Sequence, residues 1–504
     1  MLVEPAEPEF ARRYGAGEAQ VVWTRLVADL ETPVSAMLKL SAGRHNCFLL
    51  ESVEGGAVRG RYSIIGIEPD LIFRAAGAKA EVNTDPRGNP DRFEAMAEPT
   101  LRALRKVIAE SRIHLPDGLP PMSAGVFGYL GYDMVRQMEE LGPPNPDPLG
   151  FPDSVFLRPT IIVVFDAVRD EITIVTPVRP AAGVSAAQAL QRAVDRLTLA
   201  VDALDAPLDK SADQAEIDPD VLVVSNTPRE TYLDMVRKAK DYIAAGDIFQ
   251  VVLSQRFEAP FALPPFALYR ALRRVNPSPF LYFLDFGGFA VAGSSPEILV
   301  RVRDGEVTIR PIAGTRPRGE TPEQDRRLTA ELLADPKELA EHLMLLDLGR
   351  NDVGRVAEIG TVKVTDKFFP EYYSHVIHIV SNVVGKLDPA NDMLDALAAG
   401  FPAGTVSGAP KVRAMEIIDE LELEKRGIYA GCVGYFSADG AMDSCIVLRT
   451  SIVKDGRMYV QSGAGIVADS VPESEHNECV AKARALFRAA EEAVRFASAV
   501  GRGQ

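Results

Sequence analysis

The sequence has few cysteines and no long apolar run. Its four cysteines are Cys47, Cys432, Cys445 and Cys479, and none forms a CxxC pair. Such spacing gives no sign of a disulfide framework and favours a reducing compartment. No apolar stretch approaches the roughly 20 residues that span a bilayer. The N-terminal residues also resemble neither a secretory nor a transit segment. We therefore expect a cytoplasmic protein with no membrane partner.

Positive charge is also in short supply. Lysine and arginine number 55 against 71 aspartates and glutamates, which gives a net charge of −16. This balance argues against a nucleic-acid partner. The nucleophile pattern GxSxG, the zinc pattern HExxH, the dinucleotide fingerprint GxGxxG and the Walker A spacing are all absent. Cys432 lacks the glycine spacing and the histidine partner of a nucleophile, so we interpret it as a small buried apolar residue.

The composition is otherwise that of a globular protein, with 47% hydrophobic and 25% charged residues. Residues 205–220 are polar and acidic and have no periodic apolar pattern. We therefore place a linker at 206–226, between an N-terminal part at 1–205 and a second part at 227–504.

Apolar periodicity and turn residues predict the elements. The N-terminal part is expected to hold a helix near Glu18–Leu30 and a strand hairpin over Val155–Phe165 and Glu171–Val178. The second part reads as an α+β alternation. Its expected elements are a helix over Pro265–Val275, three strands over Phe280–Ile312, two helices over Pro322–Leu348, a strand near Ser374–Val384, a strand meander over Gly431–Gln461 and a final helix to about Ala499.

The stretch Gln461–Lys482 combines glycines, carboxylates and a lysine. A Gly-Ala-Gly turn follows a strand, and Ser470 with Glu473 fits a helix capping box. On the helix, Glu475, Glu478 and Lys482 stand at i, i+3 and i+7 and share one face. These groups suit a site for a metal ion and an anionic substrate.

A second carboxylate pair, Glu338 and Glu341, stands at i, i+3 on a predicted helix. Two such pairs facing each other would repel strongly, and a divalent cation would relieve the repulsion. Oxygen ligands alone favour Mg²⁺ over zinc. A solvated helix face is the alternative for either pair.

Three further segments are candidates. Arg310–Gly319 contains a Gly-Thr turn whose N–H groups could bind an anion, or it is a hairpin exit with solvated arginines. Phe401–Lys411 precedes a helix that Pro410 can begin, so it is either an anion site or an ordinary loop. His375 and His378 lie on one strand and face opposite sides, so at most one of them enters a given site.

Several sequence blocks occur together and in order. They are PIAGTRPRG, DLGRND, FPAGTVSGAPK, GIYAG and the SGAG…PESE…E…KA tail. On these blocks the sequence resembles component I of anthranilate synthase, within the chorismate-utilising enzymes, over about residues 20–490. The resemblance implies an α+β fold of two interleaved parts, with antiparallel sheets and flanking helices. It also implies a lyase that adds ammonia to C2 of chorismate with loss of the C4 hydroxyl, and then eliminates pyruvate, with Mg²⁺ as cofactor.

The resemblance also implies roles for individual residues. Glu341 and Glu478 correspond to Mg²⁺ ligands, with Glu338 and Glu475 lining the same site. Glu338 is the expected general acid for the departing C4 hydroxyl, and His378 is expected in proton transfer, with Thr405 as a polar neighbour. The implied substrate-binding set is Gly314, Thr315, Tyr429, Arg449, Gly463, Ala464, Gly465 and Lys482.

Two positions separate this family from its relatives. Gln250 stands where relatives that add water to chorismate carry a lysine, and a glutamine cannot deprotonate water. Ala313 stands where aminodeoxychorismate synthases typically carry a lysine. Both residues favour anthranilate, with an isochorismate, salicylate or aminodeoxychorismate enzyme as the alternative. A non-catalytic amino-acid-binding regulator is a further alternative, which the intact set of four glutamates disfavours.

The resemblance gives the N-terminal part a regulatory role. Leu50, Glu51 and Ser52 match the family's tryptophan feedback motif, and Asn276–Pro279 matches the opposite wall of that pocket. The implied inhibitor-binding set is Leu50, Glu51, Ser52, Pro279, Phe280, Leu281, Val433 and Tyr435. Phe280 stands where the family usually has tyrosine. Ammonia is expected from a separate glutamine amidotransferase subunit, component II, which makes a hetero-oligomer.

Overall fold

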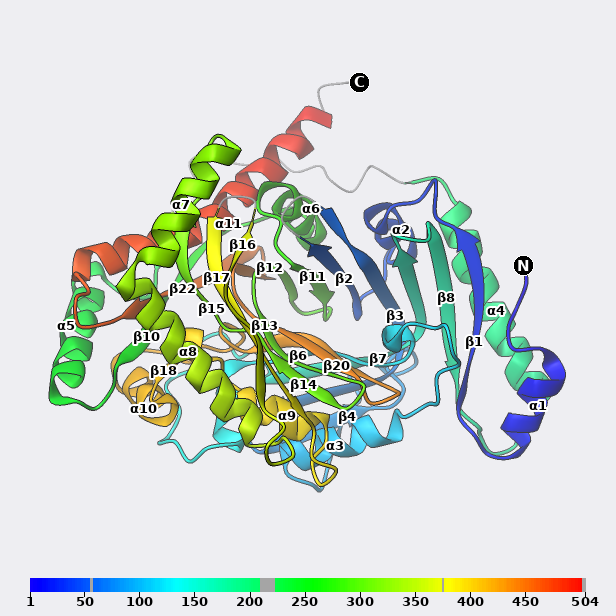
Figure 1. Ribbon diagram of the computed structural model, residues 1–504. Helices are drawn as coiled ribbons and strands as arrows, with labels where there is room; N and C mark the ends of the chain where they lie inside the picture. Colours follow the sequence, from blue (N-terminus) through cyan, green and yellow to red (C-terminus); the bar gives the residue numbers. More distant parts are fainter. Residues whose placement is uncertain (55–57, 209–222, 374–375, 501–504) are drawn as a thin grey trace.

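Strands from both ends of the sequence pair with one another, so the sheets are built jointly by the two parts of the chain (Figure 1). The computed structural model describes residues 1–54, 58–208, 223–373 and 376–500. The strand pairs in the described residues are antiparallel, as the sequence predicts for the fold. Most of the predicted linker at 206–226 lies outside the described residues, so that boundary stays a prediction.

Two long strands, β3 (Val58–Ala76) and β7 (Ser154–Asp166), belong to both of the sheet's branches. One branch continues through β2 into β11, where Ser52 is the Cα partner of Phe280. In order, its strands are β1 (Gln20–Val27), β8 (Glu171–Val178), β7, β3, β2 (Cys47–Glu54), β11 (Phe280–Asp285), β12 (Ala290–Ser295), β21 (Thr450–Lys454), β22 (Arg457–Ile466) and β10 (Gln250–Pro260), with β9 (Val224–Ser225) and β18 (Gly408–Ala409) pairing with β10.

The other branch runs from β7 through β6 into β19, where the N-terminal and C-terminal parts pair again. Its strands are β5 (Glu94–Ala95), β4 (Lys79–Asn83), β3, β7, β6 (Gly125–Leu130), β19 (Cys432–Ser437), β20 (Met442–Ile446), β13 (Ile298–Arg303), β14 (Glu306–Ile309) and β17 (Val376–Lys386), which also pairs with β15 (Ile312–Pro317) and β16 (Lys363–Tyr372). The two parts are therefore interleaved through the β2–β11 and β6–β19 pairs.

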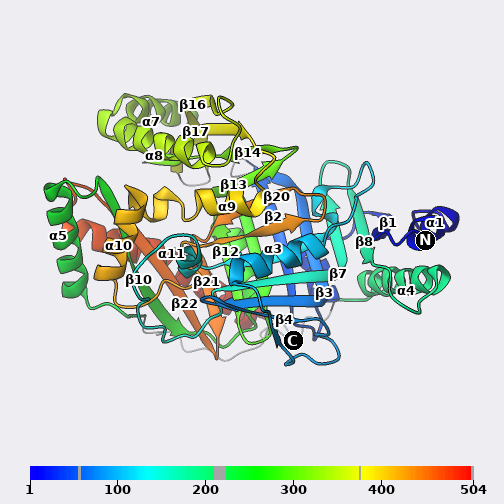
Figure 2. The same ribbon diagram turned by 90° about the horizontal axis from the view of Figure 1, so that it is seen from below.

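Helices cover the outer faces and the ends of these sheets (Figure 2). They are α1 (Glu7–Gly15), α2 (Pro33–Leu40), α3 (Thr100–Glu110), α4 (Ala186–Asp205), α5 (Arg229–Ala245), α6 (Pro265–Val275), α7 (Pro322–Ala334), α8 (Pro336–Gly354), α9 (Met393–Gly400), α10 (Lys411–Leu421) and α11 (Pro472–Val500), with short 3-10 turns η1 (Pro121–Ser123), η2 (Tyr132–Gln137) and η4 (Gly404–Val406). In Figure 2, α7 and α8 lie with β16 and β17 as a layer above the rest. In the described part of the chain, no helix is both long and apolar enough to cross a membrane.

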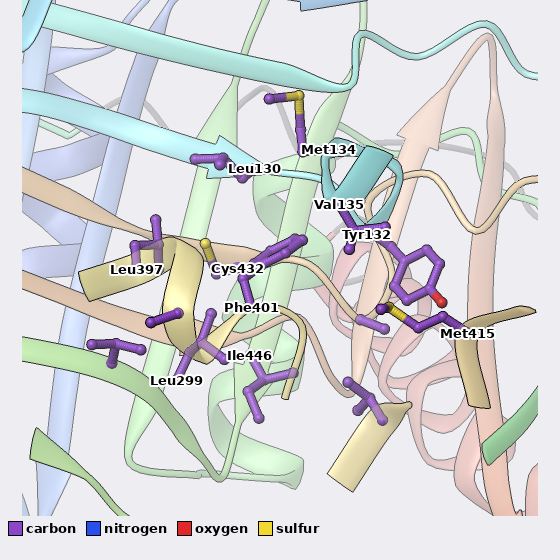
Figure 3. Close-up of a cluster of buried hydrophobic side chains, with 14 of the residues drawn as sticks. Leu130, Tyr132, Met134, Val135, Leu299, Leu397, Phe401, Met415, Cys432 and Ile446 are labelled. Carbon is purple, nitrogen blue, oxygen red and sulfur yellow. The ribbon is translucent and has the colours of Figure 1, made fainter. Parts of the chain in front are cut away.

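The core between the second sheet branch and helices α9 and α10 is close-packed and apolar (Figure 3). Cys432 is 2% exposed within it, as the sequence predicts. All four cysteine thiols are buried and free. A rigid core at this place matters for function because it supports η4 and the start of β19, both of which carry predicted site residues.

Several predictions about elements are wrong. The segment predicted as a helix near Glu18–Leu30 contains strand β1, because its β-branched residues pair with β8 over their whole length. The region Phe280–Ile312 holds four strands before β15 rather than three. Strand β16 is missing from the prediction. The capping box also fails, because the Ser470 hydroxyl accepts from Val467 N–H, and α11 begins at Pro472.

Candidate active site

The two carboxylate pairs lie on α8 and α11 and interact with each other. Burial, followed by the negative charge of Glu338 and also that of Glu478, raises the pKa of Glu341. Burial and the charge of Glu478 likewise raise the pKa of Glu475, against a hydrogen bond from Ser470. The two helices thus bring their carboxylates near enough to repel one another, as the sequence predicts.

Two cations already hold members of this carboxylate set. Arg316 donates to Glu338 Oε1 at 2.7 Å and to Asp335 at 2.7 Å. Lys482 pairs with Glu478 at 2.7 Å. Among the residues that the structure describes, no group of three or more His, Cys, Asp or Glu side chains lies in metal-binding geometry. The donor set itself consists only of carboxylate oxygens, which suits a hard divalent cation such as Mg²⁺.

Glycine is required at 314, beside this cluster. Gly314 has φ +79°, and a Cβ there would lie 3.2 Å from Glu338 Oε2 and 3.0 Å from the side chain of Ile379. Positive φ and the lack of space both favour glycine. Its neighbour Thr315 contacts His378 Nδ1 at 3.1 Å. The predicted Gly-Thr turn is instead a register shift within strand β15, where it pairs with β17. It places Gly314 and Thr315 between the carboxylates and the histidine.

His378 lies on β17, and the Nδ1 atom of its ring contacts Gly314 and Thr315. Its Nδ1 lies 3.0 Å from the carbonyl oxygen of Gly314, which can only accept, so Nδ1 carries the proton. Burial lowers the pKa of His378 to about 4. The neutral ring then presents Nε2 as a proton acceptor. His375 lies outside the described residues.

Gln250 begins β10 and is 4% exposed. Its side chain donates a hydrogen bond to Glu341. Its Nε2 lies 2.6 Å from the position that a Cβ on Gly465 would take, so only glycine fits opposite it. In the described residues Gln250 Oε1 accepts no hydrogen bond. The predicted discriminating residue is therefore in contact with the carboxylate cluster and has a free buried acceptor.

The substrate-binding candidates on β22 and its neighbours also converge. Tyr429 Oη accepts a hydrogen bond from Gly463 N–H, and burial raises the pKa of Tyr429. Lys482 Nζ donates to the Gly463 carbonyl at 2.9 Å. Ala464 is fully buried and is the Cα partner of Leu253 on β10. Gly463, Ala464 and Gly465 do not form the predicted turn, because they lie within strand β22 and pair with β10. They are fixed between β10, Tyr429 and Lys482.

Arg449 is a buried cation, and burial lowers its pKa. Its side-chain hydrogen bond to Ser278 Oγ is long, at 3.5 Å. Within the described residues no carboxylate forms an ion pair with it. A guanidinium that is taken out of water without a counter-ion is costly, so the site needs an anion.

One acid of this site is missing from the sequence prediction. Glu297 lies between β12 and β13, and Thr405 Oγ1 donates to both of its carboxyl oxygens at 3.1 Å. The N–H of Ile312, on the strand of Gly314, also donates to it. Burial raises the pKa of Glu297 to about 8. Its sequence signal is a lone carboxylate in the apolar run SSPEILV, which is the pattern of a buried acid.

A cavity of about 890 Å³ lies between the N-terminal and C-terminal parts. The inhibitor-binding candidates line it together, namely Leu50, Glu51, Ser52, Pro279, Phe280, Leu281, Val433 and Tyr435. At its far side the cavity reaches Glu371 and Tyr373. The Tyr373 hydroxyl donates to Glu371 at 2.8 Å, and its ring lies edge-on to His378 with centroids 5.2 Å apart. The cavity and the histidine are thus separated by one side chain.

Known proteins resemble this chain over nearly its whole length. The family model described as chorismate binding enzyme matches residues 45–488. Anthranilate synthase component 1 of Cereibacter sphaeroides is 58% identical, covering 98% of this chain and 99% of that protein. The Thermus thermophilus component 1 is 49% identical, covering 92% and 96%.

Solved structures agree. Anthranilate synthase component I from Streptococcus pneumoniae superposes with a TM-score of 0.76 at 38% identity, covering 92% of this chain and 99% of that one. The menaquinone-specific isochorismate synthase MenF from Escherichia coli shares the fold, with a TM-score of 0.70 at 19% identity, covering 96% and 98%. The chain therefore belongs to the anthranilate synthase component 1 family of chorismate-binding enzymes.

Proposed function

We propose that this chain converts chorismate and ammonia to anthranilate and pyruvate in a Mg²⁺-dependent reaction. The observation that supports it most is a buried cation without a counter-ion, Arg449, in the same site as a buried protonated acid, Glu297. Chorismate is a dianion that must lose a hydroxyl group. An unpaired guanidinium suits its carboxylate, and a protonated carboxyl suits its leaving group.

Substrate binding uses groups from β22, from α11, from the segment before β19 and from the segment between β20 and β21. Arg449 and Lys482 supply positive charge, and the N–H groups of Gly463 and Gly465 supply neutral donors. Lys482 contacts the Gly463 carbonyl and Glu478, so a substrate carboxylate would compete for an ammonium group already at the site. Two carboxylates held at separate points fix the orientation of the ring before it reacts.

In the first step, a bond forms between the ammonia nitrogen and C2, both ring double bonds shift by one position, and the C4–O bond breaks, while the nitrogen gives up one proton. The departing hydroxyl needs one proton to leave as water. Glu297 is the better donor than Glu338, because Glu338 accepts from the Arg316 cation whereas Glu297 is buried without a cation. Thr405 orients the Glu297 carboxyl through its two contacts.

In the second step, a proton leaves C2 and the bond between C3 and the enolpyruvyl oxygen breaks, which releases pyruvate and makes the ring aromatic. His378 is suited to accept that proton, because its Nδ1 proton is bound to the Gly314 carbonyl and Nε2 is free to accept. Its low pKa keeps the ring neutral at physiological pH.

Gln250 accounts for the choice of nucleophile. A buried amide oxygen with no hydrogen-bond partner can accept from ammonia and hold its lone pair toward the ring. The neutral amide cannot remove a proton from water, so it does not support the hydration of chorismate. This disfavours the isochorismate alternative.

The residues that would hold Mg²⁺ are Glu341 and Glu478, with Glu338 and Glu475 beside them. When bound, the ion would neutralise the mutual repulsion of these carboxylates and polarise an oxygen of the substrate. Arg316 and Lys482 occupy two of the carboxylates, so both cations must give way as the ion and the substrate enter.

We propose further that ammonia comes from a glutamine amidotransferase subunit and that tryptophan inhibits by binding in the 890 Å³ cavity. The joining of the two parts along the β2–β11 pair supports the second proposal, since Ser52 and Phe280 stand opposite each other in the cavity wall. Ser52→Phe would fill the space beside Phe280, so we expect inhibition by tryptophan to be lost and turnover of chorismate to be kept. Unchanged inhibition would place tryptophan elsewhere.

The decisive experiment mixes the chain with chorismate, ammonium and Mg²⁺ and follows anthranilate fluorescence. We expect product with ammonium salts even without a partner subunit, and no product when EDTA removes divalent cations. A chain that makes no anthranilate, or that makes it equally well in EDTA, would contradict the proposed reaction.

A further inference from the structure

A fully buried ion pair lies directly behind the substrate-binding residues. The side chains of Glu422 and Arg426 are 4% and 1% exposed. Arg426 Nη2 donates to Glu422 Oε1 at 2.6 Å, and its Nε donates to Oε2 at 3.0 Å. Neither residue belongs to a block that the family resemblance assigns to chemistry. The pair is thus a charged cluster without a role in the mechanism above.

The remaining donors of Arg426 go to the backbone of two separate segments. Its Nη1 donates to the carbonyl oxygen of Val406 at 2.7 Å, and its Nη2 donates to that of Val252 at 2.6 Å. The guanidinium carbon also lies over the Tyr132 ring at 4.7 Å and over the Tyr429 ring at 5.8 Å. One side chain therefore contacts four segments, the η4 turn, β10, η2 and the segment that leads into β19.

Glu422 extends the same cluster to β22. Its Oε1 accepts from the Ser254 N–H at 2.8 Å and from the Ser254 hydroxyl at 3.0 Å. Ser254 on β10 is the Cα partner of Gly463 on β22. The carboxylate thereby fixes β10 at the position opposite Gly463 on β22.

Three of these contacts end at, or within two residues of, a candidate site residue. Val406 follows Thr405, Val252 stands two residues after Gln250, and Tyr429 itself accepts from Gly463. A planar guanidinium with donors in fixed directions sets the relative positions of three such groups at once. An apolar residue of equal size could fill this space but would set none of these directions.

The small contribution of buried ion pairs to stability also favours a positioning role. Replacing a buried ion pair by apolar residues of similar volume is often neutral or stabilising, so stability alone gives little reason to keep one. We infer that Arg426 and Glu422 are positioning residues that hold Tyr429, Thr405 and β10 in the geometry that binds chorismate. This inference rests on the proposed function, because chorismate is taken as the ligand.

The test is the double variant Arg426→Met with Glu422→Leu, which removes both charges and keeps an apolar core. Its matched control is Arg136→Met with Asp419→Leu, an ion pair between η2 and α10 with side chains 13% and 19% exposed. Among the described residues, neither of these side chains hydrogen-bonds a residue of the proposed site. We expect the positioning double variant to melt near the temperature of the control. We also expect its kcat/KM for chorismate to fall about 100-fold, as for a misplacement on the order of 1 Å.

Chorismate affinity separates this inference from the reaction itself. The dissociation constant of chorismate, measured by titration calorimetry with Mg²⁺ and without ammonium, should rise at least about tenfold in the double variant and stay unchanged in the control. That measurement needs no product, so it tests the effect of the ion pair on chorismate binding even if the wild-type chain makes no anthranilate. A folded double variant with wild-type affinity, kcat and KM would overturn the inference.

A second variant covers the case in which the double variant does not fold. Arg426→Lys keeps the buried charge but has no planar fork, so it can serve Glu422 and not both backbone carbonyls in their present directions. We expect a folded protein with a raised KM and a smaller change in kcat. Wild-type KM in Arg426→Lys would overturn the positioning role.

Discussion

The active site and the inhibitor cavity differ in whether their buried charged groups have partners of opposite charge. In the active site, Arg449 has no carboxylate partner among the described residues, and Glu297 is buried with a hydroxyl and an amide as its donors. In the cavity, acids are matched with arginines. The pairs are Glu51 with Arg273 at 2.6 Å, Asp443 with Arg301 at 3.1 Å, and Glu371 with Arg310.

This difference corresponds to the charge of the two proposed ligands. Chorismate carries two negative charges, and an unpaired guanidinium gains its counter-ion only when the substrate arrives. Tryptophan is a zwitterion at neutral pH, and a wall of balanced pairs needs no net charge from the ligand. An unpaired buried charge therefore indicates a site that binds an ionic reactant. Paired charges indicate a site where shape and apolar contact determine which ligand binds.

Glu297→Gln should have the largest effect, because it removes the proposed proton donor from the uncompensated site. We expect kcat to fall about 10²–10⁴-fold, with little change in the KM for chorismate. The measurement is steady-state formation of anthranilate from chorismate and ammonium. A parallel Glu338→Gln variant compares the two candidate acids, and a larger loss of kcat with Glu338→Gln would return the role of acid to that residue.

The same residue sets the pH dependence. Glu297 must be protonated to act, and its pKa is about 8, so activity should persist below that pH and fall as pH rises through it. His378 must be neutral, and its pKa of about 4 keeps it neutral throughout the physiological range. A profile of kcat against pH should therefore show one descending limb near pH 8. In Glu297→Gln, that limb should be absent from the residual activity.

Arg449→Met tests the unpaired cation. We expect kcat/KM for chorismate to fall about 10²–10³-fold, since the charged contact to a substrate carboxylate is lost. Stability should not fall, and thermal unfolding should occur at the same or a higher temperature, because a buried charge without a partner has been removed. Loss of activity accompanied by a lower unfolding temperature would mean that Arg449 supports the fold instead.

Arg273→Met makes the matching change at the partner of Glu51, which lines the cavity, and should behave oppositely. It leaves Glu51 buried without its cation, so we expect the free energy of unfolding to fall by about 3 kcal/mol. That is the low end for a broken buried pair, because the Arg273 side chain retains 19% exposure. Urea unfolding measures it, with Arg92→Met at an exposed pair as control, where less than about 1 kcal/mol is expected. Chorismate turnover by the folded fraction should be unchanged.

The sequence predicts the fold well where local pattern and tertiary pairing agree. Helix α6 has the predicted bounds, and the β7–β8 hairpin lies where alternation and the Arg169-Asp170 turn place it. Strand β16 escapes prediction because its residues, KVTDKFFPEY, are mostly exposed and include a proline. Only its pairing with β17 makes it a strand, and pairing between distant segments has no local signal.

The site residues, too, could be predicted only where a local sequence pattern reveals them. Glutamates at helical spacing and closely spaced glycines are visible in one sequence, although the glycines lie in strands and not in the predicted turns. The structure brings Glu341, Glu478 and Gln250 together. Glu297 and Arg426 are not visible, because what makes them functional is burial and the partners that distant segments bring. Their pattern in sequence, a single charge among apolar residues, occurs in many cores without a function.

The smallest change concerns the shape-dominated site. Phe280→Tyr adds the hydroxyl that the family usually carries to a half-buried side chain in the cavity wall, next to Ser52 in the β2–β11 pair. One further hydrogen bond to bound tryptophan is worth about 0.5–1.5 kcal/mol, so the inhibition constant should fall about two- to tenfold. The KM for chorismate should stay the same, because Phe280 touches no proposed substrate group. Phe280→Leu, which keeps an apolar side chain and loses the ring, is the matched control and should weaken inhibition. If Phe280→Tyr instead raised the inhibition constant, the hydroxyl would be buried without a partner, and binding there would depend on apolar contact alone.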